Sequence, residues 1–165
     1  KKYSPSEYEI FIAVVYTKMN RIREKLFNEV KIKGYNLIKY VNSKAIVWGE
    51  VDVGENCFIL ENVVIQPFVK IGNNVIVWSG THIGHHSTIE DHCFITSHVV
   101  ISGNVSIGKR CFLGVNSTIR DGIKIADDCL VGAGAIILKD TKEKEIYKTS
   151  SSIPLEITSD VIKRI

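Results

Sequence analysis

The feature that most restricts the fold of this chain is an aliphatic residue at every sixth position. The row begins at Val47 and ends at Ile137, and all of its members are Val, Ile or Leu. A second row, two residues earlier, holds mostly small or slim side chains such as Cys57 and Ser87. Because alternate residues of a strand point to the same face, both rows face inward. Each six residues are therefore predicted to form one short strand and one turn.

Longer segments also recur, with a period of 18 residues. Gly54–Ile59 is matched at this spacing by Gly72–Val77, and the pattern continues at 90–95, 108–113 and 126–131. Three hexapeptides thus make one triangular coil, and neighbouring coils stack at the ~4.8 Å spacing of a sheet. The repeat has no insertion from about 45 to 140, which predicts an all-β parallel solenoid of about five coils.

The four cysteines follow the same lattice. Cys57, Cys93, Cys111 and Cys129 are separated by multiples of 18 residues. We expect them to be small buried side chains that fill a narrow core. A disulfide framework is the alternative, although nothing in the sequence indicates an oxidising compartment, and no CxxC spacing typical of zinc occurs.

Before the repeat, the chain has the order of a βαβ unit. Residues 9–15 and 35–41 are predicted to be strands, and residues 18–33 a helix that stops at Gly34. The Gly-rich phosphate loop of a full nucleotide-binding unit is absent. We therefore expect a partial Rossmann-like segment over residues 1–44.

The β-helix domain is predicted to span residues 45–140. Residues 141–165 are predicted to form a C-terminal capping tail. Within the tail, residues 145–148 are predicted to add one more strand and residues 159–165 a short helix with Ser159 as its N-cap. A solenoid needs covered ends, because bare strand edges aggregate.

Charge and hydropathy argue against two classes of partner. The net charge is only +3, and no apolar run reaches the roughly 18 residues of a membrane span. No signal-peptide pattern opens the chain, which begins at Lys1, so we expect a trimmed start. We expect a cytoplasmic protein that binds neither nucleic acid nor membrane.

Five histidines between residues 82 and 98 raise the question of a metal. His86, His92 and His98 are six residues apart, so they occupy one position on three successive faces of the coil. Faces about 120° apart cannot chelate one ion within a chain, and we expect no metal. Zinc shared between subunits, as in hexapeptide-repeat carbonic anhydrases, is the alternative.

His85 is the candidate catalytic residue. It stands at a turn, and Gly103 takes the same position one coil later. A glycine there leaves space and an open backbone N–H beside the imidazole. Acyl transfer needs such a base to remove a proton and such a donor to hold the oxyanion. The alternative is an ordinary histidine on a solvated corner.

Cations gather on the C-terminal coils. Lys139 lies two coils past Gly103 on the corner of His85, and Lys109, Arg110, Arg120 and Lys124 are nearby in the sequence. The phosphates of an acyl-CoA could use them, whereas the alternative is charge that only decorates outward positions.

These segments resemble bacterial acyl-CoA-dependent sugar acyltransferases. The similarity is to sialic acid O-acetyltransferases and to N-acetyltransferases of nucleotide-linked 4-amino sugars. It rests on residues 11–15, on a helix that carries Arg23, and on the segments 83–89, 102–108 and 111–117. The resemblance implies a left-handed β-helix, acetyl-CoA as co-substrate and a homotrimer with acetyl-CoA between adjacent subunits.

The resemblance also implies roles for individual residues. His85 falls on the family's base, and Gly103 on the residue whose N–H faces the thioester carbonyl. Val115 and Ala133 fall on backbone positions that contact the CoA arm, and Lys139 is added as an acetyl-CoA contact. His86 stands where relatives often carry an acidic residue that orients the base.

Two further positions depart from the relatives near the substrate. Trp78 replaces a small polar residue, and Phe94 replaces a histidine near the thioester. Both are predicted to contact substrate.

The resulting hypothesis is N-acetylation of a nucleotide-linked amino sugar for bacterial surface glycans, such as lipopolysaccharide or capsule. O-acetylation of a sugar hydroxyl is the first alternative. A metal-dependent or non-catalytic β-helix, or a module that only binds a nucleotide, are alternatives of other classes.

Overall fold

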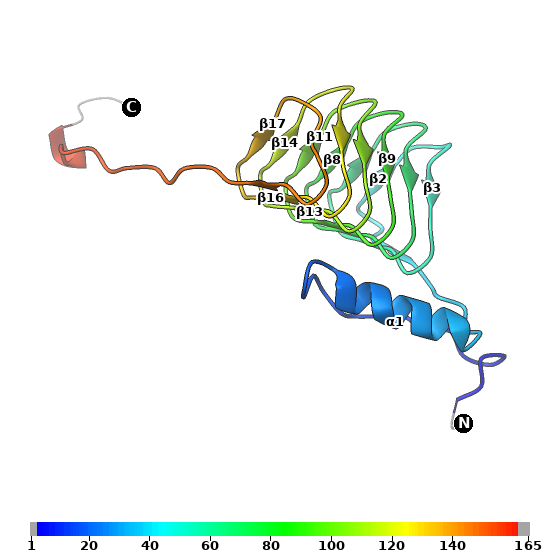
Figure 1. Ribbon diagram of the computed structural model, residues 1–165. Coiled ribbons are helices and arrows are strands. Elements are labelled where there is room, and N and C mark those ends of the chain that lie inside the picture. The colour runs from blue at the N-terminus through cyan, green and yellow to red at the C-terminus, as the bar shows by residue number, and fades with distance from the viewer. Residues whose placement is uncertain (1–2, 162–165) are drawn as a thin grey trace.

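The computed structural model describes residues 3–161 and consists of a β-helix with one α-helix along its side (Figure 1). Eighteen strands of two residues each form three parallel sheets. Because a full coil contains three strands, the β-helix has about six coils, one more than the repeat predicted. It is a left-handed parallel β-helix, as the resemblance implied.

The first sheet has seven strands. They are β1 (Tyr40–Val41), β4 (Phe58–Ile59), β7 (Ile76–Val77), β10 (Phe94–Ile95), β13 (Phe112–Leu113), β16 (Leu130–Val131) and β18 (Ile146–Tyr147). The strand β18 confirms the extra strand predicted at residues 145–148.

The second sheet has six strands and the third has five. The second comprises β2 (Ile46–Val47), β5 (Val64–Ile65), β8 (His82–Ile83), β11 (Val100–Ile101), β14 (Thr118–Ile119) and β17 (Ile136–Ile137). The third comprises β3 (Asp52–Val53), β6 (Lys70–Ile71), β9 (Thr88–Ile89), β12 (Ser106–Ile107) and β15 (Lys124–Ile125).

The register between strands confirms the 18-residue period. Phe94 pairs with Phe112 in the first sheet, and Ile101 pairs with Ile119 in the second. In the first five coils the chain runs from the first sheet to the second and then to the third, whereas after β17 it returns to the first sheet at β18 without a strand in the third. We call the turns between them the first corner (residues 78–81 and equivalents), the second corner (84–87 and equivalents) and the third corner (90–93 and equivalents).

The core is a stack of the two inward rows. Ile59, Ile83 and Ile107 are fully buried, and the row is buried from Ile59 to Ile137, whereas Val47 at its start is exposed. The four cysteines are also buried and free, which confirms that they fill the core rather than form disulfides. Their thiols contact carbonyl oxygens of the next coil, as where Cys93 Sγ lies 3.0 Å from Gly108 O.

The corners contain one left-handed residue per hexapeptide. His86, His92 and His98 have φ values of 58°, 65° and 56°, and Asn56 and Asn74 take the same conformation. Asparagine tolerates this region better than most residues with a side chain, which accounts for its frequency here. The three histidines thus occupy equivalent positions on successive corners, as the six-residue spacing predicted.

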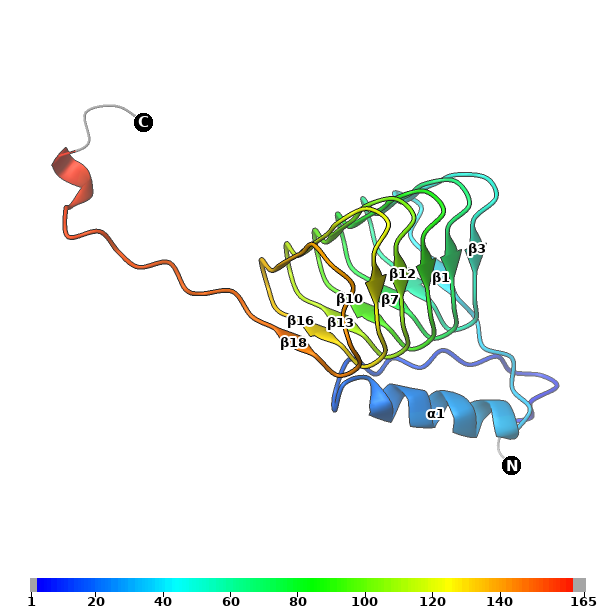
Figure 2. The same ribbon diagram turned by 45° about the horizontal axis from the view of Figure 1, so that its top comes forward.

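The helix α1 (Arg21–Ile32) runs lengthwise beside the coils, as Figures 1 and 2 both show. It confirms the helix predicted at 18–33 in shortened form. Phe27 is buried against the ring of His92, with the ring centroids 5.6 Å apart. The helix therefore packs on the third corner of the β-helix.

The predicted strands of the βαβ unit are mostly wrong, and the partial Rossmann-like segment is not confirmed. Residues 9–15 and 35–39 share a single isolated parallel bridge, between Ile10 and Leu37. Only Tyr40–Val41 is a strand, and it pairs with β4 inside the β-helix.

The backbone of residues 12–14 forms hydrogen bonds with side chains instead of with a neighbouring strand. The N–H of Ile12 donates to Oδ1 of Asn56 at 2.8 Å. The carbonyls of Ile12 and Val14 accept from the guanidinium of Arg23. Residues 12–14 are thus fixed by side chains and not by a neighbouring strand.

The tail leaves the β-helix after β18 and ends in the short 3-10 helix η1 (Ser159–Val161), coloured red in Figure 1. This covers the start of the helix predicted at 159–165, and residues 162–165 lie outside the described residues. Among residues 3–161, no helix has the length and apolar character needed to cross a membrane.

Candidate active site

The predicted site residues lie on two corners of the β-helix. His85, Gly103 and Lys139 stand on the second corner, at the same position of different coils. Val115 and Ala133 stand on the first corner, also one coil apart. The second sheet separates the two corners, so one chain does not bring the two groups together.

The imidazole of His85 lies over Gly103. A side-chain carbon at Gly103 would come within 2.7 Å of Cε1 and 2.8 Å of Nε2 of His85. His85 itself is exposed, and its backbone N–H is fixed by Gln66 Oε1 at 2.9 Å. The absence of a side chain at Gly103 is therefore what allows the ring to lie there.

The rings of His85 and His86 are in hydrogen-bond contact. The Nδ1 atoms of the two residues lie 3.1 Å apart. If His85 carries the hydrogen on Nδ1 and His86 accepts it, the lone pair of His85 is on Nε2, the atom over Gly103. The His86 ring is itself packed on Phe68, with ring centroids 4.8 Å apart. With the hydrogen in this place, the contact suits a base whose free nitrogen is Nε2.

Backbone donors are open at the predicted CoA positions. The N–H groups of Gly103, Val115 and Ala133 have no hydrogen-bond partner among residues 3–161. At the third corner, by contrast, side chains of the next coil cap the equivalent groups, as where Asp127 Oδ1 accepts from Lys109 N–H at 3.0 Å. Unpaired donors at a turn suit a ligand rich in carbonyl oxygens.

One residue of the second corner was missed by the sequence analysis. Asp121 stands between Gly103 and Lys139 in the same stack. Its Oδ1 would lie 3.1 Å from a side-chain carbon at Gly103. Asp121 therefore borders the same small space as the His85 ring. The 18-residue register that linked His85 to Gly103 could have found it.

The two aromatic residues predicted to contact substrate differ in access. Trp78 is exposed at the start of the first corner. Phe94 is only 2% exposed, since it lies beneath Tyr16 and is stacked on Phe112, with centroid distances of 4.8 and 5.7 Å. Phe94 is packed inside the chain and is therefore left out of the site.

The C-terminal cations differ in whether they are engaged in ion pairs. Arg110 is held by Asp128, with Nε 2.9 Å from Oδ1, and by Glu24, with Nη1 3.3 Å from Oε1. These carboxylates raise its pKa above the usual range for arginine. Lys109 and Lys124 line a groove of about 570 Å³ on the third sheet. Arg110 is therefore part of the helix contact, whereas the lysines remain open to a ligand.

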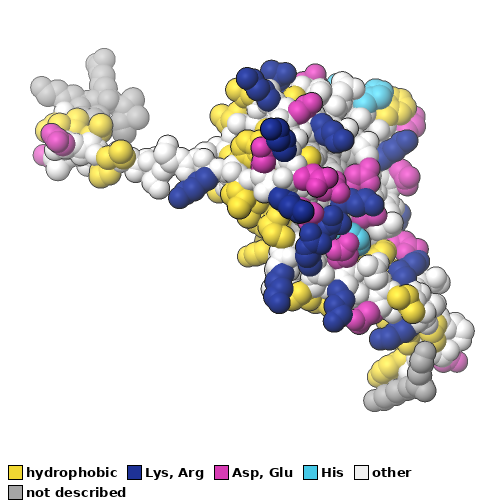
Figure 3. All heavy atoms as spheres, viewed as in Figure 1, with side chains coloured by type: hydrophobic (Ala, Val, Ile, Leu, Met, Phe, Trp, Pro, Cys, Tyr) yellow, Lys and Arg dark blue, Asp and Glu magenta, His cyan; other side chains and the backbone are white. Residues whose placement is uncertain are grey.

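Opposite charges are interleaved on the near face of the molecule. Figure 3 shows Lys and Arg side chains among Asp and Glu, without a large area of one sign. Within the described part of the chain, no group of three His, Cys, Asp or Glu side chains is arranged to hold a metal ion.

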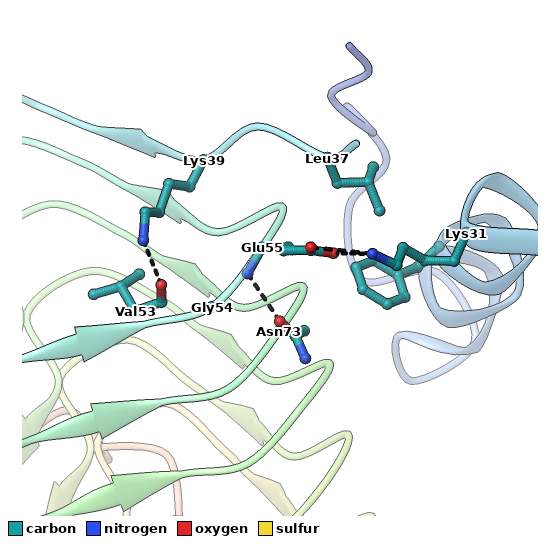
Figure 4. Close-up of a pocket in the computed structure, with 8 residues that line it drawn as sticks. Lys31, Leu37, Lys39, Val53, Gly54, Glu55 and Asn73 are labelled. Carbon is teal, nitrogen blue, oxygen red and sulfur yellow. Dashed lines mark hydrogen bonds and ion pairs between the residues drawn. The ribbon is translucent and has the colours of Figure 1, made fainter. Parts of the chain in front are cut away.

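A separate pocket of about 380 Å³ lies between α1 and the first coils (Figure 4). Its lysines have partners within the pocket: Lys31 Nζ lies 2.7 Å from Glu55 Oε2, and Lys39 donates to the backbone carbonyl of Val53. The pocket lies at the third corner and contains no histidine. We therefore do not assign catalysis to it.

Family comparisons identify the repeat. The family described as bacterial transferase hexapeptide (six repeats) matches residues 50–84 and 68–103, and the hexapeptide repeat of succinyl-transferase matches residues 104–139. No curated protein matches the chain.

Several solved structures share the fold. A variant of perosamine N-acetyltransferase from Caulobacter crescentus, in complex with CoA and GDP-perosamine, is 27% identical with a TM-score of 0.81. The match covers 85% of this chain but 65% of that one, so this chain spans slightly less than two thirds of that enzyme.

Two other structures are less similar in sequence and bear on the fold alone. The acetyltransferase domain of PglB from Neisseria gonorrhoeae is 24% identical, with a TM-score of 0.83 over 87% of this chain and 69% of its own. WeeI from Acinetobacter baumannii is 20% identical, with a TM-score of 0.78 over 84% of this chain and 66% of its own.

Proposed function

We propose that this chain, which carries the hexapeptide repeats of bacterial transferases, moves an acetyl group from acetyl-CoA to the amine of a nucleotide-linked sugar. The observation that carries the proposal is the pairing on the second corner. Nε2 of His85 lies over Gly103, and neither this atom nor the Gly103 N–H has a hydrogen-bond partner within residues 3–161. The perosamine N-acetyltransferase, which binds CoA and GDP-perosamine, supports the same chemistry by its similarity.

The two groups suit the two needs of acyl transfer. His85 Nε2 takes a proton from the acceptor amine as the nitrogen attacks the thioester carbon. The Gly103 N–H donates to the carbonyl oxygen as that oxygen gains negative charge. When the C–S bond breaks, His85 returns a proton to the sulfur. His86 keeps the base in the required tautomer throughout.

The donor would bind along the open backbone groups. We assign the Val115 and Ala133 N–H groups to carbonyl oxygens of the CoA arm and Lys139 to its phosphates. Trp78, exposed at the first corner, is assigned to the acceptor sugar.

A complete site would need more than one copy of the chain. The base stands on the second corner and the CoA-arm donors on the first, so we propose a homotrimer in which these corners of adjacent subunits face each other. Exposed apolar side chains on the intervening second sheet support this, since Ile46, Val100 and Ile136 are 59%, 41% and 65% exposed. Such a surface favours burial against another subunit.

The acceptor class suggests a role in the cytoplasmic synthesis of bacterial surface glycans, such as lipopolysaccharide or capsule. Acetyl-CoA and nucleotide-linked sugars are then the small-molecule partners, and no metal is required.

The test is release of the CoA thiol from acetyl-CoA with a panel of UDP-, dTDP- and GDP-linked sugars, with and without an amine. Turnover restricted to amino sugars supports the proposal. Turnover only with sugars that lack an amine would replace it with O-acetylation. No CoA release from a protein that contains stoichiometric zinc or cobalt would favour a metal-dependent β-helix instead.

A further inference from the structure

We infer that Asp121 binds the acceptor nitrogen in its positively charged form and thereby selects amine over hydroxyl acceptors. The inference rests on the proposed function, which assigns His85 and Gly103 but gives Asp121 no role. It names a group that would set the acceptor class at the same site.

The carboxylate of Asp121 converges with the base on one small volume. Oδ1 of Asp121 and Nε2 of His85 would lie 3.1 and 2.8 Å from the same side-chain carbon at Gly103. Their separation cannot exceed the sum of these two distances. A single acceptor nitrogen above Gly103 could therefore contact both groups at hydrogen-bond distance.

This carboxylate has no partner among the residues that the structure describes. Asp121 makes no hydrogen bond or ion pair to any residue in the range 3–161. At the third corner, aspartates in the equivalent position accept backbone N–H groups of the preceding coil. Asp91 and Asp127 accept the N–H groups of Asn73 and Lys109 at 2.7 and 3.0 Å. Asp121 differs because its charge is left free beside the base.

The chemistry of the step explains why a free carboxylate would be useful. The acceptor nitrogen forms a bond to the thioester carbon, and the C–S bond breaks. An acceptor that arrives as an ammonium loses two protons through His85, one to solvent and one to the sulfur. The nitrogen is positive in the ammonium and becomes positive again as it attacks, until His85 removes the second proton, so a neighbouring carboxylate stabilises both forms.

A hydroxyl acceptor presents the opposite case. Its oxygen becomes more negative as it loses its proton, and a carboxylate beside it opposes that change. The carbonyl oxygen of the thioester also gains negative charge, which a positive acceptor nitrogen offsets and a hydroxyl oxygen does not. Asp121 thus favours amines by attraction and disfavours hydroxyls by repulsion.

The test compares Asp121→Asn and Asp121→Glu with the wild type. Asn keeps the shape and removes the charge, whereas Glu keeps the charge. With the best amino-sugar nucleotide, kcat/KM is expected to fall about 10- to 100-fold in Asp121→Asn, which is the usual scale for a hydrogen bond to a charged group. Asp121→Glu should recover part of the lost kcat/KM. Glu143→Gln, which removes an exposed charge from the tail, should leave kcat/KM unchanged.

The dissociation constant of acetyl-CoA separates this role from a donor contact. It should change less than about twofold in Asp121→Asn. Unchanged kcat/KM in Asp121→Asn would overturn the inference and leave the proposed function standing. A loss matched by weaker acetyl-CoA binding would also overturn it, because Asp121 would then hold the CoA arm. A wild type that is silent with every amine would overturn the proposed function and this inference together.

Discussion

Nδ1 of His85 lies 3.1 Å from Nδ1 of His86, so one hydrogen is shared along a contact between two neighbouring rings. The direction of that hydrogen bond decides which nitrogen of His85 can act as a base. His86 has a φ of 58°, and it is fixed against Phe68. We propose that His86 is the partner that orients the base.

Replacement of His86 tests this orienting role. His86→Asp supplies a stronger acceptor in a backbone conformation that aspartate tolerates, and we expect activity equal to or above that of the wild type. His86→Gly removes the ring without backbone strain, and kcat should fall about 10- to 100-fold, the usual cost of losing a group that orients a ligating or catalytic histidine. Steady-state kinetics measure both. Equal activity of all three proteins would show that His86 does not orient the base.

A methyl group at Gly103 should disable the site without unfolding the protein. In Gly103→Ala the new carbon would lie 2.7 Å from Cε1 of His85, so the ring must move away. A displacement of about 1 Å can cost about 100-fold in rate, and we expect kcat to fall on that scale. Gly49→Ala is the matched control, since nothing lies within 4 Å of its new carbon. Full activity in Gly103→Ala would contradict the assigned geometry.

Arg23 should be a main determinant of how firmly the N-terminal segment is attached. Its guanidinium donates to the carbonyls of Ile12, Val14, Asn56 and Asn74. Burial lowers its pKa to about 10, so it remains charged at neutral pH. Arg23→Met would leave buried carbonyls without donors, at a cost of about 1–3 kcal/mol for each one that water does not reach.

The measurement is thermal unfolding, with Lys25→Met as the control. Lys25 stands on the same helix, and its side chain is 75% exposed in a pair with Glu29. We expect a large fall in Tm for Arg23→Met and almost none for Lys25→Met. Similar Tm values in both variants would mean that the buried hydrogen bonds contribute little.

His92 should make the protein less stable in mild acid. Burial lowers the pKa of His92 below its usual value, which outweighs the opposing effect of Glu24 and Asp91 and is reinforced by Arg110 and Lys109. Its Nδ1 also lies 2.8 Å from Nδ2 of Asn74, a contact suited to a neutral ring. As pH falls below about 6.5, the unfolded chain binds the proton first, so the free energy of unfolding decreases.

His92→Asn removes this titration and continues the ladder of Asn56 and Asn74. Denaturant unfolding between about pH 7.5 and pH 5 should show a smaller loss of stability in the variant than in the wild type. The same pH dependence in both proteins would exclude His92 as its source.

Periodicity alone predicts the β-helix because every coil reuses the same inward positions. The rows through Val47 and Cys57 therefore predict the strands, the buried cysteines and the stacking of His85 on Gly103. The N-terminal segment could not be predicted this way, since its backbone is held by Arg23 and Asn56 from distant parts of the chain. For the same reason, the contact between Arg110 and helix α1 could not be predicted from the sequence.

The most direct test of the account is the activity of His85→Ala with acetyl-CoA and an amino-sugar nucleotide on which the wild type turns over. Acetyl-CoA binding should persist, because the donor is assigned to backbone groups of Gly103, Val115 and Ala133. We predict that kcat falls about 100- to 10,000-fold, the range that a general base contributes. Wild-type kcat in His85→Ala would contradict the assignment of His85 as the base and the mechanism built on it.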